Sequence, residues 1–186
     1  TVGVHPNEAH KDEQFDDYDF IKRCSVHEKC VGIGEGGLDY YYNKKYMELQ
    51  KRSLEVQINV ARSTNLPMII HSRDADHDMI QILKKEYKKG PFKAILHCFS
   101  SSEKLANCGL DLNFFISFSG ILTFKSAKEI QKIAKKIPLN KILIETDSPY
   151  LAPTPVRGTI NEPKNCIHTL KFLSELRNID FIELSE

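Results

Sequence analysis

The sequence lacks three features that each mark a particular class of protein. No apolar run approaches the ~20 residues that a membrane helix needs, and residues 1–6 carry neither a basic start nor the long apolar segment of a secretion signal. We therefore expect a cytoplasmic protein without a membrane partner. The five cysteines include no C-x-x-C pair, which argues against a structural zinc knuckle, and their odd number argues against a disulfide framework.

The chain also lacks an excess of charge of either sign. Lys plus Arg number 26 and Asp plus Glu number 25, giving a formal net charge of +1, well short of the basic balance of proteins that hold nucleic acid by bulk charge. Any polyanion must then be bound by a few local contacts. What is present is a chain of 186 residues, 41% of them hydrophobic, with no linker or low-complexity tract, so we expect residues 1–186 to form one domain.

Short apolar runs alternate with longer segments of helical periodicity. Buried strands are predicted at 1–4, 31–33, 67–70, 94–96, 114–118 and 142–144. Helices are predicted at 46–64, 76–88, 101–110, 126–137 and 165–177. Strands that alternate with amphipathic helices indicate an α/β fold with a parallel sheet.

Ionisable side chains follow most of the predicted strands. They are His5, Glu35, His71, His97 and the pair Glu145 and Asp147. The carboxyl ends of parallel strands converge on one face, so these side chains are expected to share one pocket. Imidazole nitrogen and carboxylate oxygen suit Zn²⁺, Mn²⁺ or a related divalent ion, which predicts a hydrolytic metal site. Each residue alone is more readily a hydrogen-bonded core histidine or a helix cap, but their recurrence at strand ends favours the metal site.

These strand ends carry a family resemblance. The blocks are, in order, Gly3-Val4-His5-Pro6, Ile33-Gly34-Glu35-Gly36-Gly37-Leu38-Asp39-Tyr40, Leu66-Pro67-Met68-Ile69-Ile70-His71-Ser72-Arg73, His97-Cys98-Phe99-Ser100, Phe118-Ser119-Gly120 and Glu145-Thr146-Asp147-Ser148-Pro149-Tyr150-Leu151-Ala152-Pro153. With Arg157-Gly158 and Asn161-Glu162-Pro163, they resemble the successive signatures of TatD-type metal-dependent deoxyribonucleases. The likeness extends over nearly the whole chain.

The resemblance implies a TIM-type (β/α) barrel of the metal-dependent hydrolase superfamily. The implied activity is hydrolysis of DNA phosphodiester bonds by metal-activated water, with single-stranded DNA ends as the substrate. The implied metal ligands are Glu35, His71, His97 and Asp147, which would hold one or two Mg, Mn or Zn ions, with Glu35 bridging when two are bound. His5 would act in catalysis at the rim of the site, together with Glu35 and Asp147.

Further side chains are candidates for substrate contacts. Arg73 and Arg157 carry the permanently charged fork that suits a phosphate, and Tyr150 could donate a hydrogen bond in the pocket. Glu145 lies on the same side of its strand as Asp147, which makes it a supporting or ligand-facing residue. The three tyrosines at 40–42 could stack on a base, but we expect them to pack a loop.

The chain departs from the family pattern at both ends. The family opens with an Asp-x-His-x-His strand and a second strand, neither of which precedes Thr1, so we expect an incomplete barrel of about six of the eight βα units, truncated at both ends. Open edges would favour self-association or a partner that supplies the missing segment. Two alternatives stay open: an inactive or weakly active remnant that acts at most as a binding module, and an amide or ester hydrolase on the same scaffold.

Overall fold

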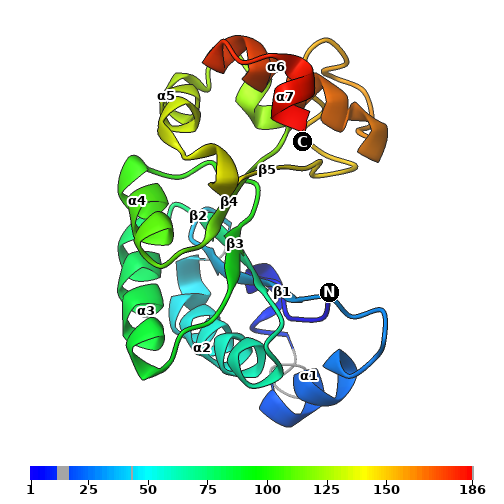
Figure 1. Ribbon diagram of the computed structural model, residues 1–186. Coiled ribbons are helices and arrows are strands. Elements are labelled where there is room, and N and C mark those ends of the chain that lie inside the picture. Colours follow the sequence, from blue (N-terminus) through cyan, green and yellow to red (C-terminus); the bar gives the residue numbers. More distant parts are fainter. Residues whose placement is uncertain (12–16, 43, 186) are drawn as a thin grey trace.

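The computed structural model describes residues 1–11, 17–42 and 44–185. A sheet of five parallel strands lies at its centre, in chain order from β1 to β5 (Figure 1). The strands are β1 Ile33–Asp39, β2 Met68–Arg73, β3 Ala94–Leu96, β4 Phe115–Phe118 and β5 Ile142–Ile144. Within the described residues the sheet is open, because β1 and β5 stand at opposite edges. The α/β class and the parallel sheet of an incomplete barrel are thus confirmed.

Helices connect successive strands, as in other βα folds. They are α1 Tyr18–Ser25, α2 Met47–Thr64, α3 Asp76–Lys89, α4 Glu103–Asp111, α5 Lys128–Lys136, α6 Cys166–Arg177 and α7 Phe181–Ser185. Short 3₁₀ turns are η1 Pro6–Glu8, η2 Lys44–Tyr46, η3 Gly120–Thr123, η4 Leu139–Lys141 and η5 Pro163–Asn165. The five predicted helices are present with shifts of a residue or two at their ends, whereas the sequence analysis did not predict α1 or α7.

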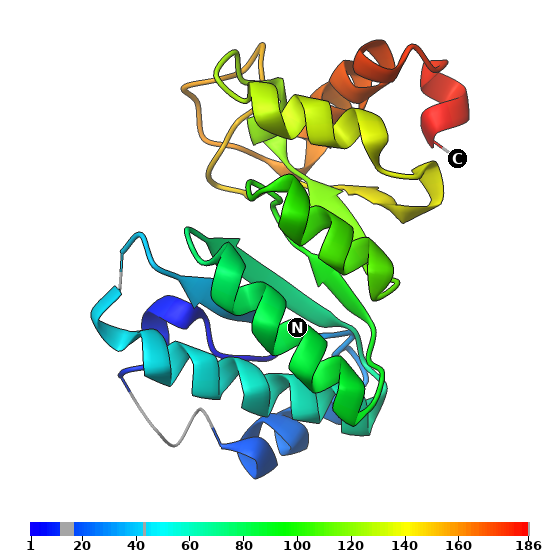
Figure 2. The same ribbon diagram turned by 90° about the vertical axis from the view of Figure 1, so that its left-hand side faces the viewer.

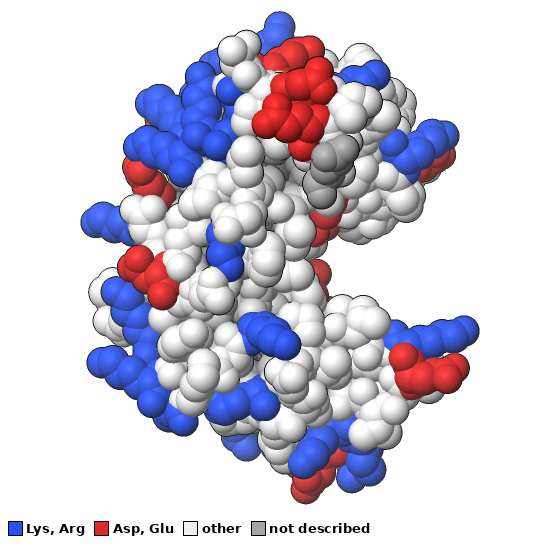
Figure 3. All heavy atoms as spheres, in the orientation of Figure 1, with Lys and Arg blue, Asp and Glu red and all other residues white. Residues whose placement is uncertain are grey.

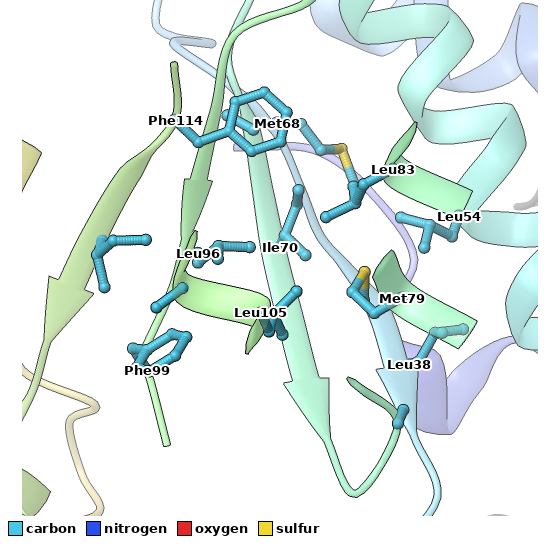
Figure 4. Packing of buried hydrophobic residues seen from close by; sticks show 14 of the residues in the cluster. Leu38, Leu54, Met68, Ile70, Met79, Leu83, Leu96, Phe99, Leu105 and Phe114 are labelled. Atoms are coloured by element: carbon cyan, nitrogen blue, oxygen red, sulfur yellow. The ribbon is translucent and has the colours of Figure 1, made fainter. Parts of the chain in front are cut away.

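The main core lies between the sheet and the helices that follow its strands. Figure 2 shows α2, α3 and α4 side by side over one face of the sheet. Figure 4 shows Ile70 of β2 and Leu96 of β3 packed toward Leu83 and Leu105 of the covering helices, and all four are almost fully buried. Burial of each such side chain contributes about 1.5–3 kcal/mol, so this layer fixes the strands whose ends carry the site.

The segment predicted as a strand at residues 1–4 forms only an isolated parallel bridge between Val2 and Ile33. Its pairing stops at Val4, because the side-chain amide of Gln57 replaces a neighbouring strand. The Val4 N–H donates to Oε1 of Gln57 at 3.0 Å, and Nε2 of Gln57 donates to the Val4 carbonyl at 2.9 Å. The buried glutamine of α2 therefore ends the strand and places His5.

Strand β1 begins at Ile33, where the predicted strand ended, and continues to Asp39. Its glycines hide it from a search for apolar runs, but close packing requires them. A Cβ on Gly37 would lie 1.9 Å from the carbonyl oxygen of His71, so any larger residue would push β1 away from β2. Glu35 consequently lies within the strand, and Asp39 is the residue at its carboxyl end.

Among the residues that the structure describes, no helix combines the length and the apolar character needed to span a lipid bilayer.

Candidate metal centre

The ionisable residues predicted from the strand ends, except Glu145, line one pocket of about 760 Å³. It is lined by His5, Asn7, Glu35, Tyr42, His71, Ser72, Arg73, His97, Cys98, Ser100, Ile121, Asp147, Tyr150 and Leu151. Figure 3 shows the molecule hollowed on its right-hand side, with acidic atoms at the inner wall of the hollow. The strand ends therefore converge as the parallel topology predicts.

The carboxylate of Glu35 is the centre of this cluster. Its Oε1 lies 2.8 Å from Nδ1 of His71, 3.6 Å from Nε2 of His5 and 3.6 Å from Nε2 of His97. Oδ1 of Asp147 lies 3.8 Å from the same Nε2 of His97. Ligand atoms of His5, Glu35 and His71 all lie within 4.8 Å of one another.

Glu145 fixes the orientation of His97. Its Oε2 lies 2.7 Å from Nδ1 of His97, and its Oε1 accepts a hydrogen bond from the backbone N–H of Cys98. An ionised carboxylate can only accept, so Nδ1 carries a proton, and in the neutral ring Nε2 presents its lone pair toward Glu35 and Asp147. The same contact holds Cys98 at a positive φ of 44°, a conformation that few side chains other than Asn and Asp favour.

Asp39 orients His71, as Glu145 orients His97. Its Oδ2 lies 3.3 Å from Nε2 of His71, close enough for ionic attraction, although this buried nitrogen has no hydrogen bond of acceptable geometry. Burial lowers the pKa of His71, but the carboxylates of Asp39 and Glu35 outweigh burial and raise the pKa to about 9. Asp39 directs Nδ1, rather than Nε2, toward Glu35.

His5 differs from the other two histidines. Its Nδ1 accepts a hydrogen bond from the backbone N–H of Asn7 at 3.1 Å, so the neutral ring carries its proton on Nε2, which faces Glu35. Burial is the largest cause that lowers the pKa of His5, and Glu35 opposes it. In this arrangement His5 offers the pocket a hydrogen-bond donor rather than a lone pair.

The donor set fits a divalent cation. Burial raises the pKa of Asp147, and the nearby carboxylates of Glu35 and Glu145 raise it further, against the opposing effect of His97. Carboxylates gathered in a half-buried pocket repel one another unless a cation is held between them. With imidazole nitrogens directed at the same point, the residues provide the oxygen and nitrogen ligands typical of Zn²⁺ or Mn²⁺.

The predicted substrate contacts fall in different places. Arg73 and Tyr150 line the pocket, and Tyr150 is 70% exposed. Arg157 is not among the lining residues; its guanidinium carbon lies 3.9 Å from the centroid of the Phe124 ring. Ser119, from the Phe118-Ser119-Gly120 block, is fully buried, and its hydroxyl lies 3.0 Å from Sγ of Cys98.

Sequence reasoning did not single out Asp39 or Asn7. Asp39 is the last residue of a glycine-rich strand that was not recognised beyond Ile33, although an acid at a strand end was the available signal. Asn7 donates through its backbone N–H to Nδ1 of His5 and through its side-chain amide to Oδ2 of Asp39 at 3.3 Å, and the sequence has no signal for either contact.

A parallel sheet with histidines and carboxylates at the carboxyl ends of its strands is typical of the barrel-type metal-dependent hydrolases. The model of one such family, described as TatD related DNase, matches residues 1–186. The chain belongs to this TatD family.

Individual relatives agree with this assignment. The chain is 42% identical over 185 residues to the Bacillus subtilis protein named uncharacterized metal-dependent hydrolase YabD, covering all of this chain and 72% of that protein. It is 39% identical over 186 residues to Escherichia coli YcfH, a protein with the same description, covering 100% of this chain and 69% of YcfH.

Solved structures are similar as well. The TatD homologue YJJV from Escherichia coli superposes with a TM-score of 0.89 at 27% identity, over 100% of this chain and 71% of that one. A TatD family hydrolase from Entamoeba histolytica gives a TM-score of 0.80 at 26% identity, over 99% and 69% of the two chains. Family, relatives and fold together support a metal-dependent hydrolase.

Proposed function

We propose that this chain hydrolyses phosphodiester bonds of DNA, with one or two divalent ions held by Glu35, His71, His97 and Asp147. The observation that carries the proposal is the convergence of imidazole nitrogens on one carboxylate oxygen of Glu35 in an open pocket. The description of the matching family as DNases supports DNA as the substrate.

A bound divalent ion would activate water and stabilise negative charge on the phosphate oxygens. The protein's own residues prepare the pocket for that chemistry. Glu145 keeps the proton of His97 on Nδ1, and Asp39 turns Nδ1 of His71 toward Glu35. His5 presents an Nε2–H donor that suits a phosphate oxygen, and the guanidinium of Arg73 adds positive charge to the pocket wall.

The test is cleavage of an end-labelled single-stranded oligonucleotide by the purified chain with Mg²⁺, Mn²⁺ or Zn²⁺, and with chelator. We expect metal-dependent cleavage that Asp147→Asn lowers by orders of magnitude, because the substitution replaces a charged ligand by a neutral amide. Asp111→Asn, at an exposed position of α4, makes the same chemical change away from the pocket and serves as the matched control.

Three outcomes would overturn the proposal. Hydrolysis of amide or carboxylic ester model substrates without DNA cleavage would assign the scaffold to another reaction. A folded chain that binds Mn²⁺ and cleaves none of these substrates would be an inactive remnant. Equal cleavage by wild type and Asp147→Asn would show that the activity comes from a contaminant or another site.

A further inference from the structure

The loop after β1 exposes two of its three tyrosines, and one of these two, Tyr42, lines the pocket. Tyr40 packs inward, and its hydroxyl donates to Oδ2 of Asp78 at 2.7 Å. Tyr41 and Tyr42 instead are 59% and 65% exposed. Their rings stand at 89° to each other with centroids 4.7 Å apart. The expectation that all three tyrosines pack the loop therefore holds for Tyr40 alone.

The guanidinium of Arg73 lies against both exposed rings. Its central carbon is 4.0 Å from the centroid of Tyr41 and 4.8 Å from that of Tyr42. Arg73 ends β2 directly opposite Asp39 of β1 in the sheet register, which explains how the loop and the arginine meet. Stacking uses the flat face of a guanidinium and leaves its edge N–H groups able to bind a phosphate.

The position of this aromatic pair is tied to the metal centre through Asp39. Oδ1 of Asp39 accepts hydrogen bonds from the backbone N–H groups of Tyr41 at 3.0 Å and Tyr42 at 3.2 Å, while its Oδ2 faces His71. The backbone of Asp39 is held on both sides by the buried amide of Gln50, at 2.8 and 3.1 Å. One buried carboxylate thus sets both the tyrosine loop and a predicted metal ligand.

The place and chemistry of this surface point to a flat aromatic ligand. Tyr42 and Arg73 line the same pocket as Glu35 and His71, so a ligand on the rings lies beside the predicted reaction centre. Solvent-exposed rings with an adjacent cation match a base that is attached to a phosphate, since every base has a face that stacks on an aromatic ring. In double-stranded DNA those faces are already stacked, so the ligand must be unpaired.

We propose that Tyr41, Tyr42 and Arg73 form a binding site for an unpaired nucleobase next to the phosphodiester bond that is cleaved. This inference rests on the proposed function. It adds which part of the substrate, in addition to the phosphate, the protein recognises. The exposed face of Tyr42 stacks on the base, and Arg73 contacts the phosphate attached to it.

The experiment measures binding in chelator, where no cleavage occurs. Each single-stranded oligonucleotide carries a dye at one end. At the other end, the first, second or third nucleotide is replaced by an abasic analogue, one position at a time, and each such oligonucleotide is compared with the unmodified one. Anisotropy gives the dissociation constants, and quenching of 2-aminopurine at the same positions reports stacking. At one position we expect the normal oligonucleotide to bind on the order of tenfold more tightly than the abasic one.

Tyr42→Leu keeps apolar bulk but removes the ring, and it should bring the ratio of the two dissociation constants close to one and abolish the quenching. Tyr41→Leu should lower the ratio in the same direction. Ile182→Ala, at a similarly exposed apolar residue of α7 (64% exposed), is the control and should keep the wild-type ratio. Thermal unfolding of each variant checks that the fold is retained.

Failure of this inference is distinguishable from failure of the proposed function. Metal-dependent DNA cleavage with a base-to-abasic ratio near one at every position would overturn the nucleobase site and leave the nuclease standing. Tighter binding of the normal than of the abasic oligonucleotide, lost in Tyr42→Leu, would support the site even if no cleavage is found. A wild-type ratio that survives both tyrosine substitutions would place base recognition elsewhere and overturn the inference.

Discussion

The two oxygens of the Glu145 carboxylate each accept a hydrogen bond from a different donor, which the neutral amide of a glutamine cannot reproduce. One oxygen faces Nδ1–H of His97 and the other accepts from the N–H of Cys98. An amide offers one acceptor and one donor group, so it either leaves one of the two donors without an acceptor or moves the proton of His97 from Nδ1 to Nε2. The lone pair that His97 directs into the pocket therefore depends on a residue that need not touch the ion.

We predict that Glu145→Gln weakens Mn²⁺ binding by about 10–100-fold, the effect typical of supporting residues that orient a metal ligand. Calorimetric titration with Mn²⁺ measures it, and cleavage activity should recover as the metal concentration is raised. Glu129→Gln, in an exposed pair with Lys132 on α5, is the matched control. A Glu145→Gln variant with wild-type Mn²⁺ affinity would contradict the orienting role.

The pairing of His71 with two carboxylates predicts a pH dependence of stability without metal. Its folded pKa of about 9 lies above the ordinary value of 6.5. A raised pKa stabilises the fold fully below pH 6.5, and the stabilisation is lost as the pH rises through about 9. We expect the urea midpoint in chelator to fall across that window. His71→Gln should flatten this part of the profile; a parallel decline in both proteins would assign the effect to other groups.

Among the elements of the fold, the helices that follow the strands were predictable, whereas most of the first strand, β1, was not. Amphipathic spacing places α2 and α3 because one apolar face of each packs on the sheet. β1 is rich in glycine, and its requirement for glycine arises from the approach of β2, which is a property of the assembled sheet.

The candidate site also has residues whose positions the sequence predicts and residues whose positions it does not. His71 and His97 could be predicted because strand ends converge in any parallel sheet. The direction of Tyr42 could not be, since it follows from the hydrogen bond between its N–H and Asp39. Likewise, the packing of Arg157 on Phe124 depends on tertiary contacts that motif spacing does not encode.

The backbone of Val4 depends on one glutamine of α2, because Gln57 replaces a strand partner there. We predict that Gln57→Leu destabilises the chain by about 1–3 kcal/mol, since it leaves buried backbone groups of Val4 without partners. Urea unfolding measures the change. Gln81→Leu, at an exposed position of α3, is the control, and a Gln57→Leu variant as stable as this control would contradict the account.

The chain as a whole presents an open sheet rather than a closed ring within the described residues, with β5 at one edge. In the parallel ladder the Glu145 N–H points to the Phe118 carbonyl of β4 at 3.1 Å. Alternate residues face opposite sides of a strand, so the N–H of Ile144 points away from β4. An unpaired strand edge with partly exposed apolar side chains is a template for pairing with another chain.

We propose that this open edge makes the 186-residue chain associate with itself, and we predict concentration-dependent dimers or larger species in sedimentation experiments. Ile144→Pro removes the outward N–H without breaking a bond to β4, and it should shift the distribution toward monomer. Circular dichroism establishes that the variant folds. A wild-type chain that stays monomeric at high concentration, unfolds cooperatively and binds no hydrophobic dye would show that the edge is already protected.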